Sequence, residues 1–155
     1  MRKRIDPAIS HGSALVAEQW LDLVSLAEIE ITSEDPAHPI EAALIPGTGS
    51  GWRASTPGTQ TIRVIFDEPR ALRHIHLAFT EDETPRTQEF VLRWSSGDSN
   101  SSQEIVRQQY NFIAGSSEVE EYVVELNGVK TVELEIIPSI GGGDIYASLT
   151  ELCFR

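Results

Sequence analysis

The stretch TIRVIFDEPRALRHIHLAF, residues 61–79, decides the fold class of this chain. Apolar side chains recur at every second position on both sides of the central DEPR segment, at Ile62, Val64, Phe66, Ile75, Leu77 and Phe79. A period of two is typical of β-strands with one buried face, whereas an amphipathic helix repeats its apolar residues every three or four positions. The stretch therefore predicts two strands joined by a turn that contains Pro69.

The same alternation continues along the rest of the chain. Residues 29–31, 90–94, 106–110, 122–126, 132–136 and 145–154 each read as a strand, and Asn127-Gly128 predicts a tight turn between two of them. Only residues 13–23 favour a short helix, with Ser13 as its N-cap. About eight strands at regular intervals predict an all-β fold, an antiparallel β-sandwich of the jelly-roll type.

The predicted core follows from the same spacing. We expect eleven side chains to point between the sheets: Ile62, Val64, Phe66, Ile75, Leu77, Phe79, Leu92, Tyr122, Val124, Leu134 and Ile136.

Length and composition indicate one domain. The chain has 155 residues, of which 40% are hydrophobic and 23% charged, values that are ordinary for a globular protein. We expect a single sandwich domain over residues 1–155, with residues 1–17 as a loose lead-in. Residues 33–60 are dense in Pro, Gly, Ser and Thr and read as one long irregular segment, which in a small domain is usually functional.

The charge narrows the set of partners. Twelve Lys and Arg residues stand against 24 Asp and Glu residues, for a net charge of −12. Because nucleic acids and anionic membranes are bound mainly through Lys and Arg, neither is an expected partner. No apolar run follows the basic residues 2–4, and none reaches membrane-spanning length, so the sequence predicts a cytoplasmic protein without membrane insertion. It leaves the oligomeric state open.

The sequence contains no recognised catalytic or nucleotide-binding motif. SIGGGD, residues 139–144, leads into a strand and reads as a flexible loop rather than a phosphate site. His74 and His76 share a strand face, where they either chelate a metal or simply face water. Cys153, the single cysteine, reads as a small buried hydrophobe. We therefore expect no enzyme activity.

A run of acids in residues 116–135 suggests a second kind of surface. Its members are Glu118, Glu120, Glu121, Glu125, Glu133 and Glu135, against a single base, Lys130. The run is either a solvated sheet face or an acidic surface for docking a protein partner.

Several segments together resemble a known family. They are EIEITSEDPAHPIEAAL, GWRAS, TIRVIF, DEPRALRHIHLAF, TQEFVLRWSS and GGGDIYASLTEL, spread over about residues 24–155. In order and spacing they are similar to the galactose-binding-like superfamily, which includes the discoidin or coagulation factor type C domains and related carbohydrate-binding modules. The resemblance implies an eight-stranded jelly roll that binds ligands, commonly glycans, through loops at one end.

The resemblance also implies a structural calcium ion. Glu151 in ASLTEL occupies the position of a glutamate that ligates calcium in the family. The family uses a further acid shortly before the tryptophan, but LIPGTGSGW has no acid between Glu41 and Trp52. Glu34 and Asp35 are the nearby acids that would substitute for it.

The expected function is non-catalytic carbohydrate binding by loops 33–53, 80–88, 95–103, 111–118 and 138–146. Trp52 either caps the end of the sandwich or offers a ring for sugar stacking, and Tyr146 is the other candidate ring. The candidates for polar contacts are Arg53, Arg86 and Asn111, since an arginine fork can bind paired hydroxyls. The alternative is a cytoplasmic protein-interaction domain that uses the acidic sheet face.

Overall fold

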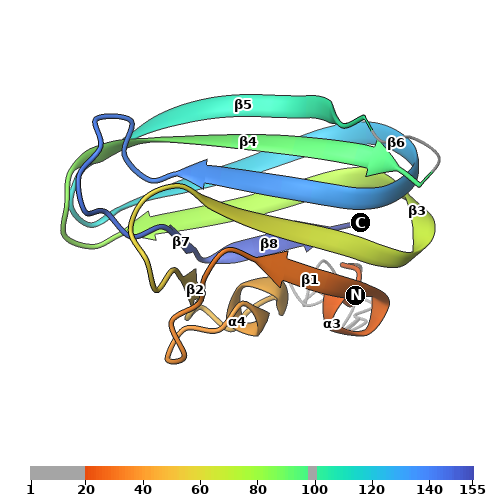
Figure 1. Ribbon diagram of the computed structural model, residues 1–155, viewed down its shortest axis with the longest axis horizontal. Helices are drawn as coiled ribbons and strands as arrows, with labels where there is room; N and C mark the ends of the chain where they lie inside the picture. The colour runs from red at the N-terminus through yellow and green to blue at the C-terminus, as the bar shows by residue number, and fades with distance from the viewer. Residues whose placement is uncertain (1–19, 98–100) are drawn as a thin grey trace, which may run out of the picture.

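The computed structural model describes residues 20–97 and 101–155, and it confirms an antiparallel β-sandwich (Figure 1). Two one-turn helices, α3 (Leu23–Leu26) and α4 (Glu41–Leu44), lie beside the first strand. The strands are β1 (Ala27–Ile31), β2 (Trp52–Arg53), β3 (Gln60–Glu81), β4 (Arg86–Ser96), β5 (Gln103–Phe112), β6 (Ser116–Ile137), β7 (Ser148–Leu149) and β8 (Glu151–Phe154).

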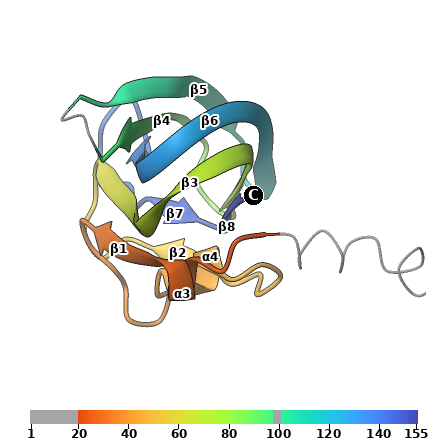
Figure 2. The same cartoon turned by 90° about the vertical axis from the view of Figure 1, so that its right-hand side faces the viewer.

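Two long strands, β3 and β6, run through both layers of the sandwich (Figures 1 and 2). Residues 60–66 of β3 pair with β1 and with the second half of β6, and β4 and β5 extend this first layer. Residues 74–81 of β3 pair with the first half of β6 on one side. On the other side they pair with β8, which completes the second layer.

The turns predicted at DEPR and at Asn127-Gly128 are wrong, because the strands continue through both segments. The register of β3 against β6 shifts between Ile65 and His74, so the extra residues bend the strands instead of reversing them. Gly128 has a φ of 67°, a conformation that favours glycine, and it serves this bend. Arg73 joins the two bends by donating to the Leu126 carbonyl at 3.0 Å. The four strands predicted in these two regions are therefore two long strands, β3 and β6.

The predicted core is confirmed, although two of its residues are only half-buried. All of its residues are buried apart from Tyr122 and Val124, which are half-buried against it. Phe79 of the second layer meets Phe90 of the first, with ring centroids 5.3 Å apart. Burying side chains of this size contributes roughly 1.5–3 kcal/mol each, which makes the contact between the layers a main source of stability.

The predicted lead-in, and most of the predicted helix over residues 13–23, lie outside the described residues. In the described part of the chain, no helix is both long and apolar enough to span a bilayer. Cys153 is buried as expected, and burial raises the pKa of its thiol to about 12, so it is unreactive at neutral pH.

Candidate functional site

A groove of 450 Å³ opens at one end of the sandwich. The turn between β3 and β4, which contributes to it, lies at the left of Figure 1. Three rim segments form it: residues 49–53, which lead into β2, residues 80–84, which follow β3, and residues 144–150, which contain β7. Its volume falls within the range of about 300–1,000 Å³ that is usual for ligand pockets. Besides Arg53 and Tyr146, its polar lining includes Ser50, Thr80, Thr84, Ser148, Thr150, Asp82, Glu83 and Asp144.

The pairing of β2 with β7 explains which side chains reach the groove. Trp52 lies opposite Leu149 and Arg53 opposite Ser148, and the Ala54 amide donates to the Ala147 carbonyl at 2.9 Å. Side chains alternate between the two faces of such a pair, so Trp52 and Ala54 point into the core while Arg53 points outward. The same alternation leaves Tyr146 on the outer face, 40% exposed. Arg53 and Tyr146, two of the residues predicted to bind a ligand, therefore lie at one surface.

Gly51 allows this pairing. Its φ is 70°, and a Cβ atom placed on it would lie 2.6 Å from the Leu149 carbonyl oxygen. Any side chain at this position would therefore force β2 away from β7.

A second segment holds β2 from its other side. The Arg53 amide donates to the His38 carbonyl at 3.1 Å, and the Asp35 amide donates to the Arg53 carbonyl at 2.8 Å. These bonds bring His38 to the edge of the groove. Both backbone groups of Arg53 are thus held, while its exposed guanidinium makes no hydrogen bond or ion pair with the described residues.

Trp52 belongs to the core and does not offer its ring to a ligand. Its side chain is 1% exposed, and its indole N–H donates to the Ser33 carbonyl at 3.1 Å. Trp52 therefore caps the core and has no free ring face on which a sugar could stack.

Arg86, predicted as a ligand contact, is instead part of the interior. Its side chain is 2% exposed, and its Nε donates to Glu81 at 2.7 Å. Its Nη1 donates to the Pro138 carbonyl at 2.6 Å, and the guanidinium lies 4.6 Å from the Phe112 ring centroid. Arg86 thus lies outside the groove lining and holds the Glu81 carboxylate, which belongs to that lining, in place. Burial raises the pKa of Glu81, but hydrogen bonds from the Glu83 amide and Arg86 outweigh it and lower the pKa overall.

Asn111 lies on β5, away from the groove lining. Its Oδ1 accepts a hydrogen bond of 2.6 Å from the Thr87 hydroxyl on β4. This contact joins two strands and gives no sign of a ligand.

The proposed calcium ligands do not converge. Glu34 accepts a hydrogen bond of 2.6 Å from the Ile40 amide, and Asp35 accepts one of 3.0 Å from the Ala37 amide. Glu151 instead lies 3.1 Å from His76 on the outer face of the second layer. Among residues 20–97 and 101–155, no group of three or more His, Cys, Asp or Glu side chains is arranged to hold a metal ion. The described residues therefore do not form the implied calcium site.

His74 and His76 share one face, as their spacing predicted. Both bind the same carboxylate, with His74 2.7 Å and His76 2.8 Å from Glu121. These hydrogen bonds, from His74 and then His76, lower the pKa of Glu121. Trp20 packs against both imidazole rings, at centroid distances of 5.5 and 5.9 Å. The cluster holds the start of the described chain on the second layer.

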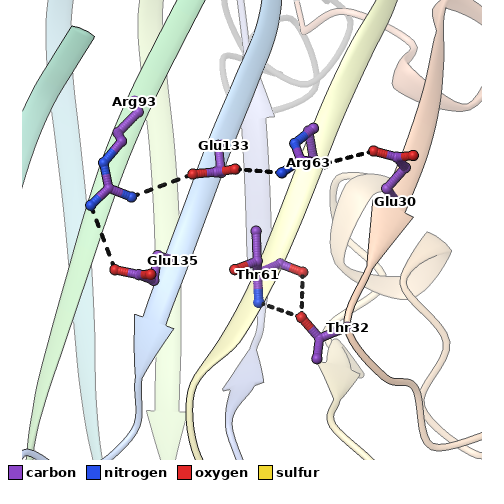
Figure 3. Close-up of polar contacts among 7 residues, drawn as sticks. All are labelled: Glu30, Thr32, Thr61, Arg63, Arg93, Glu133 and Glu135. Atoms are coloured by element: carbon purple, nitrogen blue, oxygen red, sulfur yellow. Dashed lines mark hydrogen bonds and ion pairs between the residues drawn. The ribbon is translucent and has the colours of Figure 1, made fainter. Parts of the chain in front are cut away.

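The acidic run does not form one exposed face. Glu133 lies between Arg63, at 2.8 Å, and Arg93, at 3.4 Å (Figure 3). Glu118 points into the sandwich, where it is 2% exposed and neither carboxylate oxygen has a hydrogen-bond partner. Burial, followed by the nearby Glu120, raises its pKa to about 8. Since other members are paired or buried, the run gives no continuous acidic surface for a partner.

The sequence predicted three of the groove's loops but missed most of its polar lining. Asp82, Glu83 and Asp144 were overlooked because they belong to no motif. The two glycines before Asp144 could have indicated a turn of the rim at this position. Gly142 and Gly143 have φ values of 81° and 96°, which shape that turn.

Neither a family model nor a curated protein matches this sequence. Solved structures do match its fold. The family 32 carbohydrate-binding module of C. perfringens NanJ, in complex with galactose, is 14% identical with a TM-score of 0.64, over 87% of this chain and 96% of that one. A second family 32 module from Clostridium perfringens, in complex with GalNAc-β-1,3-galactose, is 18% identical with a TM-score of 0.58, over 88% and 99%. An F5/8 type C domain from Bacteroides fragilis is 13% identical with a TM-score of 0.59, over 87% and 93%. At such identities the likeness shows that this chain shares their jelly-roll fold.

Proposed function

We propose that this protein is a non-catalytic carbohydrate-binding module whose ligand lies in the groove at the end of the sandwich. The observation that carries the proposal is the meeting of an exposed aromatic ring, Tyr146, with an unpaired arginine fork, Arg53, in a concave polar site. The complexes of similar folds with galactose and with GalNAc-β-1,3-galactose support the same class of ligand.

The two residues have complementary roles. A sugar ring has an apolar C–H face, which packs on the apolar face of the tyrosine ring. Its hydroxyls point outward from the ring, where the planar fork of Arg53 can bind a neighbouring pair. Ser50, Ser148 and Thr150 add hydroxyls that donate or accept as the ligand requires.

One carboxylate of the groove, Glu81, favours binding over hydrolysis. A glycosidase needs a carboxylic acid whose pKa is raised so that it can protonate the leaving group. Glu81, the partly buried carboxylate of the lining, has a lowered pKa and is fixed by Arg86. This is the opposite of what a general acid requires.

A glycan array followed by titration of the best ligand tests the proposal. Arg53→Ala should weaken binding about tenfold or more, because a hydrogen bond to a charged group contributes roughly 1.5–3 kcal/mol. Tyr146→Ala should also weaken binding, because it removes the ring on which the sugar packs. Their melting temperatures should match the parent's, since both side chains are exposed. Arg107→Ala is the matched control, an exposed arginine on β5 outside the groove. The absence of any glycan ligand, or variants that bind like the parent, would overturn the proposal.

A further inference from the structure

A second hollow adjoins the groove. It has a volume of 330 Å³ and is lined by Asp35, Pro36, Ala54 and Ser55, together with Arg53 and Tyr146. Arg53 and Tyr146 also line the first groove, and they are the only residues that the two hollows share. The two side chains therefore form a ridge with a concave surface on each side.

The backbone fixes this ridge. The Ala54 amide bonds to the Ala147 carbonyl at 2.9 Å, and the Gly58 amide bonds to the Ile145 carbonyl at 3.0 Å, so the two segments run side by side. The Asp35 amide ties the floor of the second hollow to the Arg53 carbonyl at 2.8 Å. Backbone hydrogen bonds thus join the segments that line both hollows.

The second hollow offers its own polar groups. The Ser33 hydroxyl accepts a hydrogen bond of 3.1 Å from the Ser55 amide, which fixes the backbone of Ser55. The Ser55 hydroxyl itself is exposed and makes no hydrogen bond with the described residues. Asp35 is half-buried and uses Oδ1 to accept from the Ala37 amide at 3.0 Å. A free hydroxyl, a fixed carboxylate and the ring of Pro36 make a small site with polar and apolar sides.

We propose that the second hollow is a second sugar subsite, so that the ligand is an oligosaccharide whose chain crosses the ridge of Arg53 and Tyr146. The inference rests on the proposed function and extends it to the length of the ligand. Each hollow is as large as a small ligand pocket, and a single sugar unit would fill only one of them. A chain of two or more units would place consecutive rings on either side of Tyr146, with the linkage over the ridge.

Titrations with sugars of increasing length test this. The probes are galactose, glucose, mannose and N-acetylglucosamine, and the β-1,4-linked dimers to hexamers of each. In at least one series the affinity should rise about tenfold or more from monomer to dimer or trimer, as expected when a second set of contacts adds about 1.4 kcal/mol. Ser55→Leu, which narrows the second hollow without offering an aromatic ring, should remove this gain. The affinity for monomers should stay unchanged, because Ser55 does not line the first groove.

Thr59→Leu is the matched control, because Thr59 is exposed in the same loop but lines neither hollow. Affinity that is flat with length, or a gain that survives Ser55→Leu, overturns the second subsite. If monomers bind and lose affinity in Tyr146→Ala while length has no effect, the proposed function stands and this inference fails. If no probe binds and the glycan array is also negative, both fail.

Discussion

Replacing Glu118 by glutamine should change how the stability of this protein depends on pH. Glu118 is 2% exposed, both its oxygens lack partners, and its folded pKa is about 8 against an ordinary value of 4.5. Because the folded pKa is raised, the contribution to stability is fully present below pH 4.5 and is lost as the pH rises to 8. In this window the unfolded chain releases a proton that the folded chain retains.

The magnitude follows from the two pKa values. Each unit of difference is equivalent to about 1.4 kcal/mol, so by pH 7 the parent has lost about 3 kcal/mol through this one group. The amide that replaces the carboxyl group in Glu118→Gln cannot ionise, so the variant avoids this loss. The free energy of unfolding of Glu118→Gln minus that of the parent should therefore grow by about 3 kcal/mol between pH 4.5 and 7.

Urea unfolding followed by tryptophan fluorescence, in half-unit steps from pH 4.5 to 8.5, measures this difference. Glu125→Gln removes a carboxylate from the exposed face of the same strand and should give a nearly constant difference. If the curves of Glu118→Gln and the parent run parallel, Glu118 is not a buried, unpartnered acid and the reasoning is refuted.

Four further predictions concern the rim and its supports. Gly51→Ala should lower the melting temperature more than Gly49→Ala, because both residues have positive φ but only Gly51 has no room for a Cβ atom. Arg86→Ala should destabilise the fold by about 3–5 kcal/mol in urea unfolding, since it leaves the partly buried Glu81 without its ion pair. A glycan that bears carboxylates should bind at least about tenfold more weakly than its neutral counterpart, with the gap narrowing as salt is added, because Asp82, Glu83 and Asp144 have no ion pairs within the described chain. Melting temperatures in calcium and in chelator should be equal, and a calcium-dependent rise that Glu151→Gln abolishes would instead establish the site implied by the resemblance.

Alternation along strands was enough to predict the sandwich and its core, but not the continuity of its two longest strands. Pro69 and Gly128 favour turns and bulges alike, and what separates the two outcomes is the pairing of β3 with β6 across the chain. Local sequence does not contain that pairing. The predicted number of strands was nevertheless close, because the short strands β2 and β7 replaced the two that merged.

The same alternation, applied more strictly, would have corrected two site residues. Arg86 lies four residues before Phe90 on β4, and Glu118 lies four residues before Tyr122 on β6. Residues an even number of positions apart lie on the same face of a strand, so the pattern places Arg86 and Glu118 on the inner face. They were read as surface residues because of their charge, which assumes that charged side chains are exposed. The position of Arg53 at the groove follows from its place next to Trp52, which the core buries, while its role in binding stays a prediction.

Because β3 and β6 pass through both layers, they affect how the domain folds and unfolds. Gln60 must pair with Ile136 to form the central strand pair of the first layer, and Glu81 must pair with Ser116 to form that of the second. Contacts of such long range in sequence make folding slow. They also prevent one layer from detaching while the other remains, because the two layers share the same two backbones. We expect unfolding in a single cooperative step, with the deepest amide protons of both layers exchanging at one common rate.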